Sequence, residues 1–214
     1  IGIWGTGGLG KTTLARAFYE RKWQNFEIHC FLHNVREVYE KDRLISLQRK
    51  LLFSLDKRSM KVHDCDEGRK RIKKLLDDKK VLLVLDDVSD ICQLEDLAPK
   101  QGWFSEGSLI IITTRDKHLL SSHGVSAKYD MKFLSNKESL ELFIKKAFRG
   151  EQPNEEYLDL ARIVIEYARG LPLALKVLGS SLCEGTIEEW KDALAKFKKL
   201  PPNDILKILQ VSYE

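Results

Sequence analysis

The segment that most constrains the fold of this chain is a glycine-rich loop close to the amino terminus. Residues 5–12 read Gly-Thr-Gly-Gly-Leu-Gly-Lys-Thr, which fits the pattern G-x-x-x-x-G-K-[ST] of phosphate-binding loops. A strand pattern that is already under way at Ile1 precedes the loop, so we expect the chain to be part of a longer polypeptide, and a helical pattern over 13–19 follows. This strand-loop-helix context favours a nucleotide-binding loop over a chance glycine-rich turn.

The residues of this loop have distinct expected roles. Backbone amides turned inward would surround the β- and γ-phosphates, and the helix that follows would add the partial positive charge of its amino end. Lys11 is expected to reach the phosphate oxygens, and the hydroxyl of Thr12 is expected to bind Mg²⁺. The expected nucleotide-binding residues of the loop are Gly5, Gly7, Gly8, Leu9, Gly10, Lys11, Thr12 and Thr13.

Polar residues at the ends of two later strand patterns are expected to complete the site. Asp86 and Asp87 follow the apolar run 81–85, and carboxylates that leave a buried strand are costly without a cation. We therefore assign Asp86 to Mg²⁺, through its water shell, and Asp87 to orienting or deprotonating an attacking water. Arg115 ends the run 109–114 and is expected to report the nucleotide state. The alternative for each residue is an ordinary polar strand end in solvent.

The order of the patterns predicts an α/β fold. Up to about residue 133, short apolar runs at 28–32, 81–85, 109–113 and 129–133 alternate with helical patterns such as 44–55. Such alternation indicates βαβ units and a mainly parallel sheet. The second and third runs are continuously apolar, which predicts central strands covered on both faces.

After residue 133 the strand signal stops and the apolar period becomes helical. Ser135 and Glu138 form a capping box that opens a first helix, a second is expected over 155–169, Pro172 opens a third, and a capping box at Thr186 opens a fourth. The expected domains are a P-loop nucleotide-binding domain (1–134), a small all-helical subdomain (135–200) and a short third segment (201–214).

Composition excludes some classes of protein but does not assign a function. The balance of 43% apolar and 32% charged residues is typical of a globular protein. A net charge of +4 is too small and too mixed to indicate a nucleic-acid or membrane partner. We interpret the basic run 69–74 as the solvated face of a helix that buries Ile72, Leu75 and Leu76. Four cysteines without a CxxC pair are typical of a reducing compartment, so we expect a cytoplasmic protein, with access to the nucleus left open.

Four segments together resemble a known family. In chain order they are 5–13, 81–88, 107–116 and Gly-Leu-Pro-Leu-Ala at 170–174, and they are similar to the NB-ARC module of plant intracellular disease-resistance proteins, a P-loop NTPase of the STAND class. The segment 26–37 resembles the version in receptors that carry an amino-terminal TIR domain. The resemblance covers essentially the whole chain.

The resemblance implies a switch that rests with ADP and is activated when ATP replaces it, with homo-oligomerisation afterwards. It implies that Pro172 packs near the adenine, that 135–200 is the first ARC subdomain, and that 201–214 begins a truncated winged-helix (second ARC) subdomain. It also implies intramolecular TIR and leucine-rich-repeat partners in the parent chain.

Two other functions remain as alternatives, an efficient P-loop ATPase or motor and an interaction scaffold without nucleotide. No glutamate follows Asp86, although many fast ATPases place their water-activating base there, and this favours slow hydrolysis. Lys11, Thr12 and Asp86 are all present, and a scaffold has no physical need to keep the three together.

Overall fold

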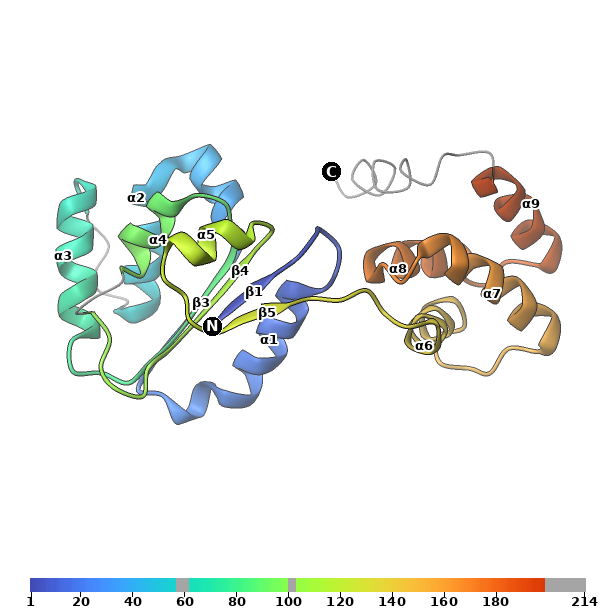
Figure 1. Cartoon of the computed structure of the whole chain (residues 1–214), viewed down its shortest axis with the longest axis horizontal. Helices are drawn as coiled ribbons and strands as arrows, with labels where there is room; N and C mark the ends of the chain where they lie inside the picture. The colour runs from blue at the N-terminus through green and yellow to red at the C-terminus, as the bar shows by residue number, and fades with distance from the viewer. Residues whose placement is uncertain (57–61, 100–102, 199–214) are drawn as a thin grey trace. The chain divides into compact units, whose positions relative to one another are not determined.

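The computed structural model describes residues 1–56, 62–99 and 103–198 (Figure 1). Their contacts divide the chain into two compact units. The first consists of Ile1–Gly7 and Lys11–Met131, and the second begins at Lys132 and also includes Gly8–Gly10. The predicted winged-helix segment, 201–214, lies outside the described residues.

The first unit is built on a five-stranded parallel sheet with the order β2-β3-β4-β1-β5. The strands are β1 (Gly2–Trp4), β2 (Ile28–Leu32), β3 (Val81–Val88), β4 (Leu109–Thr114) and β5 (Lys128–Asp130). Both continuously apolar runs form interior strands, β3 and β4. The predicted α/β fold with a parallel sheet is therefore confirmed.

Helices cover both faces of this sheet (Figure 1). They are α1 (Lys11–Lys22), followed by a 3-10 turn (Trp23–Asn25), α2 (Val35–Leu55), α3 (Cys65–Leu76), α4 (Ile91–Leu97) and α5 (Lys117–Ser122). Side chains alternate along β3, so Leu82 and Val84 share a core with α1, whereas Leu83 and Leu85 share the larger core with α2, α3, α4 and α5. This two-sided burial explains why the β3 run is continuously apolar.

The basic run 69–74 lies on α3, as interpreted from the sequence. Ile72 and Leu76 are fully buried, and the charged residues of the run are exposed. Two of those charges are paired, Arg69 with Asp96 and Arg71 with Glu67. The run is thus the solvated face of an amphipathic helix.

Two elements of the first unit differ from their predicted bounds. The last strand was expected over 129–133 but spans Lys128–Asp130, because its sheet partner is β1, which offers three residues for pairing. The helix expected over 44–55 begins at Val35 and is interrupted at Arg43, whose φ is 65°.

At 21 residues α2 is the longest helix of the described part of the chain, and it carries charged side chains along its length. Within residues 1–56, 62–99 and 103–198, no helix combines the length and the apolar character that crossing a membrane requires.

The second unit is helical. It consists of α6 (Asn136–Ala147), α7 (Glu155–Ala168), α8 (Pro172–Ser181) and α9 (Ile187–Lys198). Ser135 and Glu138 form the predicted capping box of α6, and Pro172 occupies the first turn of α8. The predicted starts of these helices are confirmed, because each depended on local signals, either a capping side chain or the fixed φ of a proline at the first position.

An aromatic cluster closes the core of this helical unit. The indole of Trp190 is buried and lies 5.6 Å from the ring of Phe143 and 5.1 Å from that of Tyr157, measured between centroids. Its Nε1 donates to the carbonyl oxygen of Leu182 over 2.9 Å, so the buried polar atom has a partner.

Candidate functional site

The glycine-rich loop leaves the carboxyl end of β1 and enters α1, the connection that the motif requires. The side chain of Lys11 folds back over this loop. Its Nζ donates to the carbonyl oxygens of Gly5 and Thr6 over 2.8 and 2.9 Å, and the residue is only 7% exposed. Burial lowers the pKa of Lys11, and the nearby Arg115 lowers it further. A cation that has lost part of its hydration next to the amino end of a helix is a suitable partner for phosphate.

The conformation of the loop explains two of its glycines. Gly8 and Gly10 have φ values of +82° and +92°, in the region where side chains are strained. A Cβ on Gly8 would also lie 2.9 Å from that of Leu173, whose amide donates to the Gly8 carbonyl oxygen over 3.2 Å within the second unit. Leu9 is buried, and Thr13 is exposed in the first turn of α1.

Asp86 lies at the centre of a buried hydrogen-bonded group formed by three elements. Its Oδ1 accepts from the hydroxyl of Thr12 on α1 over 2.7 Å and from the hydroxyl of Thr113 on β4 over 2.7 Å. Asp86 itself, on β3, is 1% exposed. The structure therefore brings the two predicted metal-binding residues into direct contact.

The oxygen atoms of this group fit Mg²⁺, which prefers carboxylate, hydroxyl and phosphate oxygens. Thr12 and Asp86 would hold the ion, and the bound ion would neutralise charge on the phosphates. Within the described ranges, no three or more His, Cys, Asp or Glu side chains are grouped to hold a metal. A magnesium ion at a phosphate loop does not need such a group, because the nucleotide supplies ligands.

Asp87 is held in an unusual conformation beside Asp86. Its φ is +56°, and its amide donates to the hydroxyl of Thr113 over 2.8 Å. The Oδ2 atom lies 2.7 Å from Nη2 of Arg36, and the Oδ1 atom lies 3.5 Å from Nε of Arg115. Both oxygens of the predicted catalytic carboxylate are thus engaged by arginines.

Arg115 lies beside the loop, as the sequence predicted. The guanidinium carbon is 3.5 Å from the position that a Cβ on Gly7 would occupy, and the side chain is 48% exposed. Arg36 was not predicted. It follows β2 by four residues, and since the carboxyl ends of parallel strands meet at one edge of the sheet, that position was the available signal. Pro172, the remaining predicted residue, is buried at the start of α8 in the second unit.

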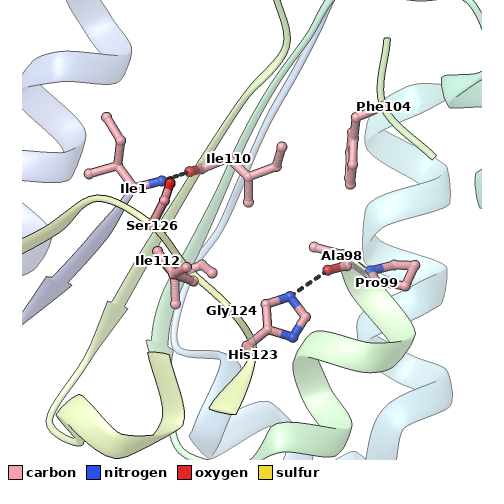
Figure 2. Close-up of a pocket in the computed structure, with 10 residues that line it drawn as sticks. Ile1, Ala98, Pro99, Phe104, Ile110, Ile112, His123, Gly124 and Ser126 are labelled. Atoms are coloured by element: carbon pink, nitrogen blue, oxygen red, sulfur yellow. Dashed lines mark hydrogen bonds between the residues drawn. The ribbon is translucent and has the colours of Figure 1, made fainter. Parts of the chain in front are cut away.

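A separate pocket of about 380 Å³ lies toward the amino ends of β1 and β4 (Figure 2). Ile110 and Ile112 line one side, and His123 lies opposite, with Nε2 at 2.9 Å from the carbonyl oxygen of Ala98. None of the predicted nucleotide-binding residues lines it. The group around Lys11 and Asp86, at the other end of the sheet, is the better candidate for a functional site.

Comparison with known proteins shows which family the chain resembles. Residues 1–153 match the family model described as the NB-ARC domain. The chain is 41% identical over 216 residues to disease resistance protein RUN1 of Vitis rotundifolia and 40% identical over 221 residues to TMV resistance protein N of Nicotiana glutinosa. Each alignment covers 100% of this chain but only 16% and 19% of the respective relatives, so the chain spans less than a fifth of their length.

Proposed function

The chain belongs to the NB-ARC domain family of plant disease-resistance proteins, and we propose that it is an ADP/ATP-operated switch that controls an immune receptor. It holds ADP at rest and ATP when active, with Mg²⁺, and it hydrolyses ATP slowly. The observation that carries the proposal is the contact of 2.7 Å between Thr12 and Asp86 beside the buried ammonium of Lys11. A nucleotide switch needs at least an amine that binds phosphate and a pair of side chains that binds Mg²⁺ at the same loop.

Slow hydrolysis follows from the surroundings of Asp87. In this proposal Asp87 orients or deprotonates the attacking water, for which a carboxylate oxygen must be within hydrogen-bonding reach of that water. Both oxygens are engaged by Arg36 and Arg115. The two arginines restrict the approach of water to Asp87, and this restriction suits a regulatory timer better than a motor.

Contact with the base is assigned to Pro172. In this proposal its ring packs near the adenine, so that the helical unit responds to the nucleotide. Support comes from Gly8–Gly10, which belong to the same compact unit as Pro172, and from the hydrogen bond between Leu173 and Gly8. Replacing Pro172 by alanine would then lower the affinity for adenine nucleotides but leave the affinity for inorganic triphosphate unchanged.

The context of the switch is also part of the proposal. The parent receptor would carry a TIR domain and leucine-rich repeats as intramolecular partners, form homo-oligomers once activated, and work in the cytoplasm or in both cytoplasm and nucleus. We expect neither a membrane nor a nucleic-acid partner for this module.

The test is to identify the nucleotide that co-purifies with the chain and then to measure ATP turnover. The switch predicts ADP and a turnover far below the roughly 1–10³ s⁻¹ of ordinary enzymes. Turnover within that range would show that the chain is an efficient ATPase or motor and not a switch. A chain that neither retains nor binds adenine nucleotide would be a scaffold.

A further inference from the structure

Two arginines hold Asp87, and they hold it with different strength. Arg36 lies 2.7 Å from Oδ2, within the range of a charge-assisted hydrogen bond, whereas Arg115 lies 3.5 Å from Oδ1, beyond that range. The exposed fraction of the side chain is 35% for Arg36 and 48% for Arg115. Arg36 is therefore the tighter and more buried partner, and Arg115 is the one that can leave.

The backbone around Arg36 explains why this arginine stays in place. It lies in the first turn of α2, directly after the fully buried Val35, which anchors the turn in the core. This first part of α2 lies between two residues with positive φ, Asn34 at 51° and Arg43 at 65°. The chain thus forms a short, separately oriented helical segment whose buried residue fixes the position of the arginine.

Arg115, in contrast, is already beside the phosphate loop. Its guanidinium carbon lies 3.5 Å from the Cβ position of Gly7. A terminal phosphate group carries more negative charge than one carboxylate and can accept two parallel hydrogen bonds from a guanidinium group. A γ-phosphate would therefore compete with Asp87 for this loosely held arginine.

The charges around the loop respond to one another. Arg115 and Arg36 both lower the pKa of Lys11, and Asp87 and Asp86 both raise it. Three cations thus face two carboxylates in one cluster. If Arg115 moved to a phosphate and no other cation remained at Asp87, an unpaired carboxylate would lie close to an anionic ligand, an arrangement that like-charge repulsion disfavours.

We propose that Arg36 is a positioning residue that keeps Asp87 paired while Arg115 moves from Asp87 to the γ-phosphate of ATP, and that Arg36 thereby sets the preference for ATP over ADP. This inference rests on the proposed nucleotide switch and adds a residue to it. ADP lacks the γ-phosphate, so its binding does not require Arg115 to leave and depends little on Arg36.

The experiment measures dissociation constants for ADP·Mg²⁺ and ATPγS·Mg²⁺ by calorimetry. For Arg36→Ala we expect ATPγS to bind about tenfold more weakly than to the wild type, and ADP to change by less than about twofold. Arg36→Gln keeps most of the side-chain stem without the charge and should behave in the same way, whereas Arg36→Lys should recover part of the ATPγS affinity. The matched control is Lys41→Ala, which removes an exposed ion pair with Glu37 on the same helix and should change neither constant.

A double variant separates positioning from a structural role. Asp87→Asn removes the carboxylate that would be left unpaired, so adding it to Arg36→Ala should restore the ratio of ATPγS to ADP affinity. If Arg36→Ala and Arg36→Gln lower the affinity for both nucleotides equally, the ratio of ATPγS to ADP affinity does not change. The inference is then wrong, although the proposed switch stands. If the wild type binds neither nucleotide, the proposed function itself fails.

Discussion

The two units of the chain differ in what they bury. The first unit buries charged and hydroxyl side chains at the carboxyl end of its sheet, among them Lys11, Asp86 and Thr113. In the described part of the second unit, the buried polar or charged residue is Ser139, and the rest of the core is aliphatic and aromatic. Buried polar groups cost free energy unless they are paired. The buried polar side chains of the candidate site therefore belong to the first unit, whereas the second unit is built for helix packing.

Among the substitutions that test this difference between the two units, Trp190→Ala is expected to have the largest effect. The residue is fully buried among aromatic rings, and removal of such a side chain costs about 3–5 kcal/mol. We expect the helical unit to lose protection against hydrogen exchange while the sheet keeps it. Trp23→Ala is the control, because Trp23 is 37% exposed and should cost much less. Equal loss of protection in both units would contradict the separation.

The next largest effect is expected at the phosphate loop. Lys11→Ala removes the amine that the loop offers to phosphates, and a hydrogen bond to a charged group contributes about 1.5–3 kcal/mol. We expect ADP and ATP to bind about 100-fold more weakly, with little change in thermal stability because the substitution also removes a buried charge. Lys22→Ala, at the exposed end of α1, is the control. Wild-type affinity of the Lys11 variant for both nucleotides would show that the loop does not bind phosphate.

The comparison also shows what the sequence could predict. In the helical unit the capping box at Ser135 and the proline at 172 located helix starts, because capping depends on neighbours in the chain. In the first unit the motifs located the loop, Asp86 and Arg115, because the ends of parallel strands meet at one edge. Arg36 was not predicted, since its contact with Asp87 joins positions 51 residues apart and its only sequence signal was its place shortly after β2.

A smaller effect is expected when the hydroxyl-carboxylate pair is broken. Asp86→Ala should remove the Mg²⁺ dependence of nucleotide binding. The variant lacks the carboxylate that would hold the water shell of the ion, and Thr12 alone cannot replace it. We expect the gain in ATP affinity on adding Mg²⁺ to fall by about tenfold. The neighbouring Asp87→Ala should keep the Mg²⁺ dependence but hydrolyse ATP more slowly. Loss of Mg²⁺ dependence in the Asp87 variant instead would exchange the roles of the two carboxylates.

The smallest effect concerns the capping box at the start of the helical unit. The amide of Ser135 donates to Oε2 of Glu138 over 2.8 Å, and the amide of Glu138 donates to Oγ of Ser135 over 3.3 Å. Replacement of a serine cap by alanine costs about 1 kcal/mol. Ser135→Ala should therefore increase protease cleavage near Phe133, which is exposed, while ADP affinity stays constant.

The same cap makes a prediction about pH. Hydrogen bonds from the side chain and the amide of Ser135 lower the pKa of Glu138. Because the pKa is lower in the folded than in the unfolded chain, the stabilisation is present above the unfolded value and is lost as the pH falls through the folded value. Cleavage near Phe133 should therefore rise in mild acid in the wild type, and Glu138→Gln, which keeps a capping side chain without a titrating group, should flatten that dependence. If cleavage of the Glu138→Gln variant still rises in mild acid, other carboxylates cause the pH dependence. Since neither substitution touches the sheet, a change in nucleotide affinity at either position would show that the cap of α6 affects nucleotide binding as well as local stability.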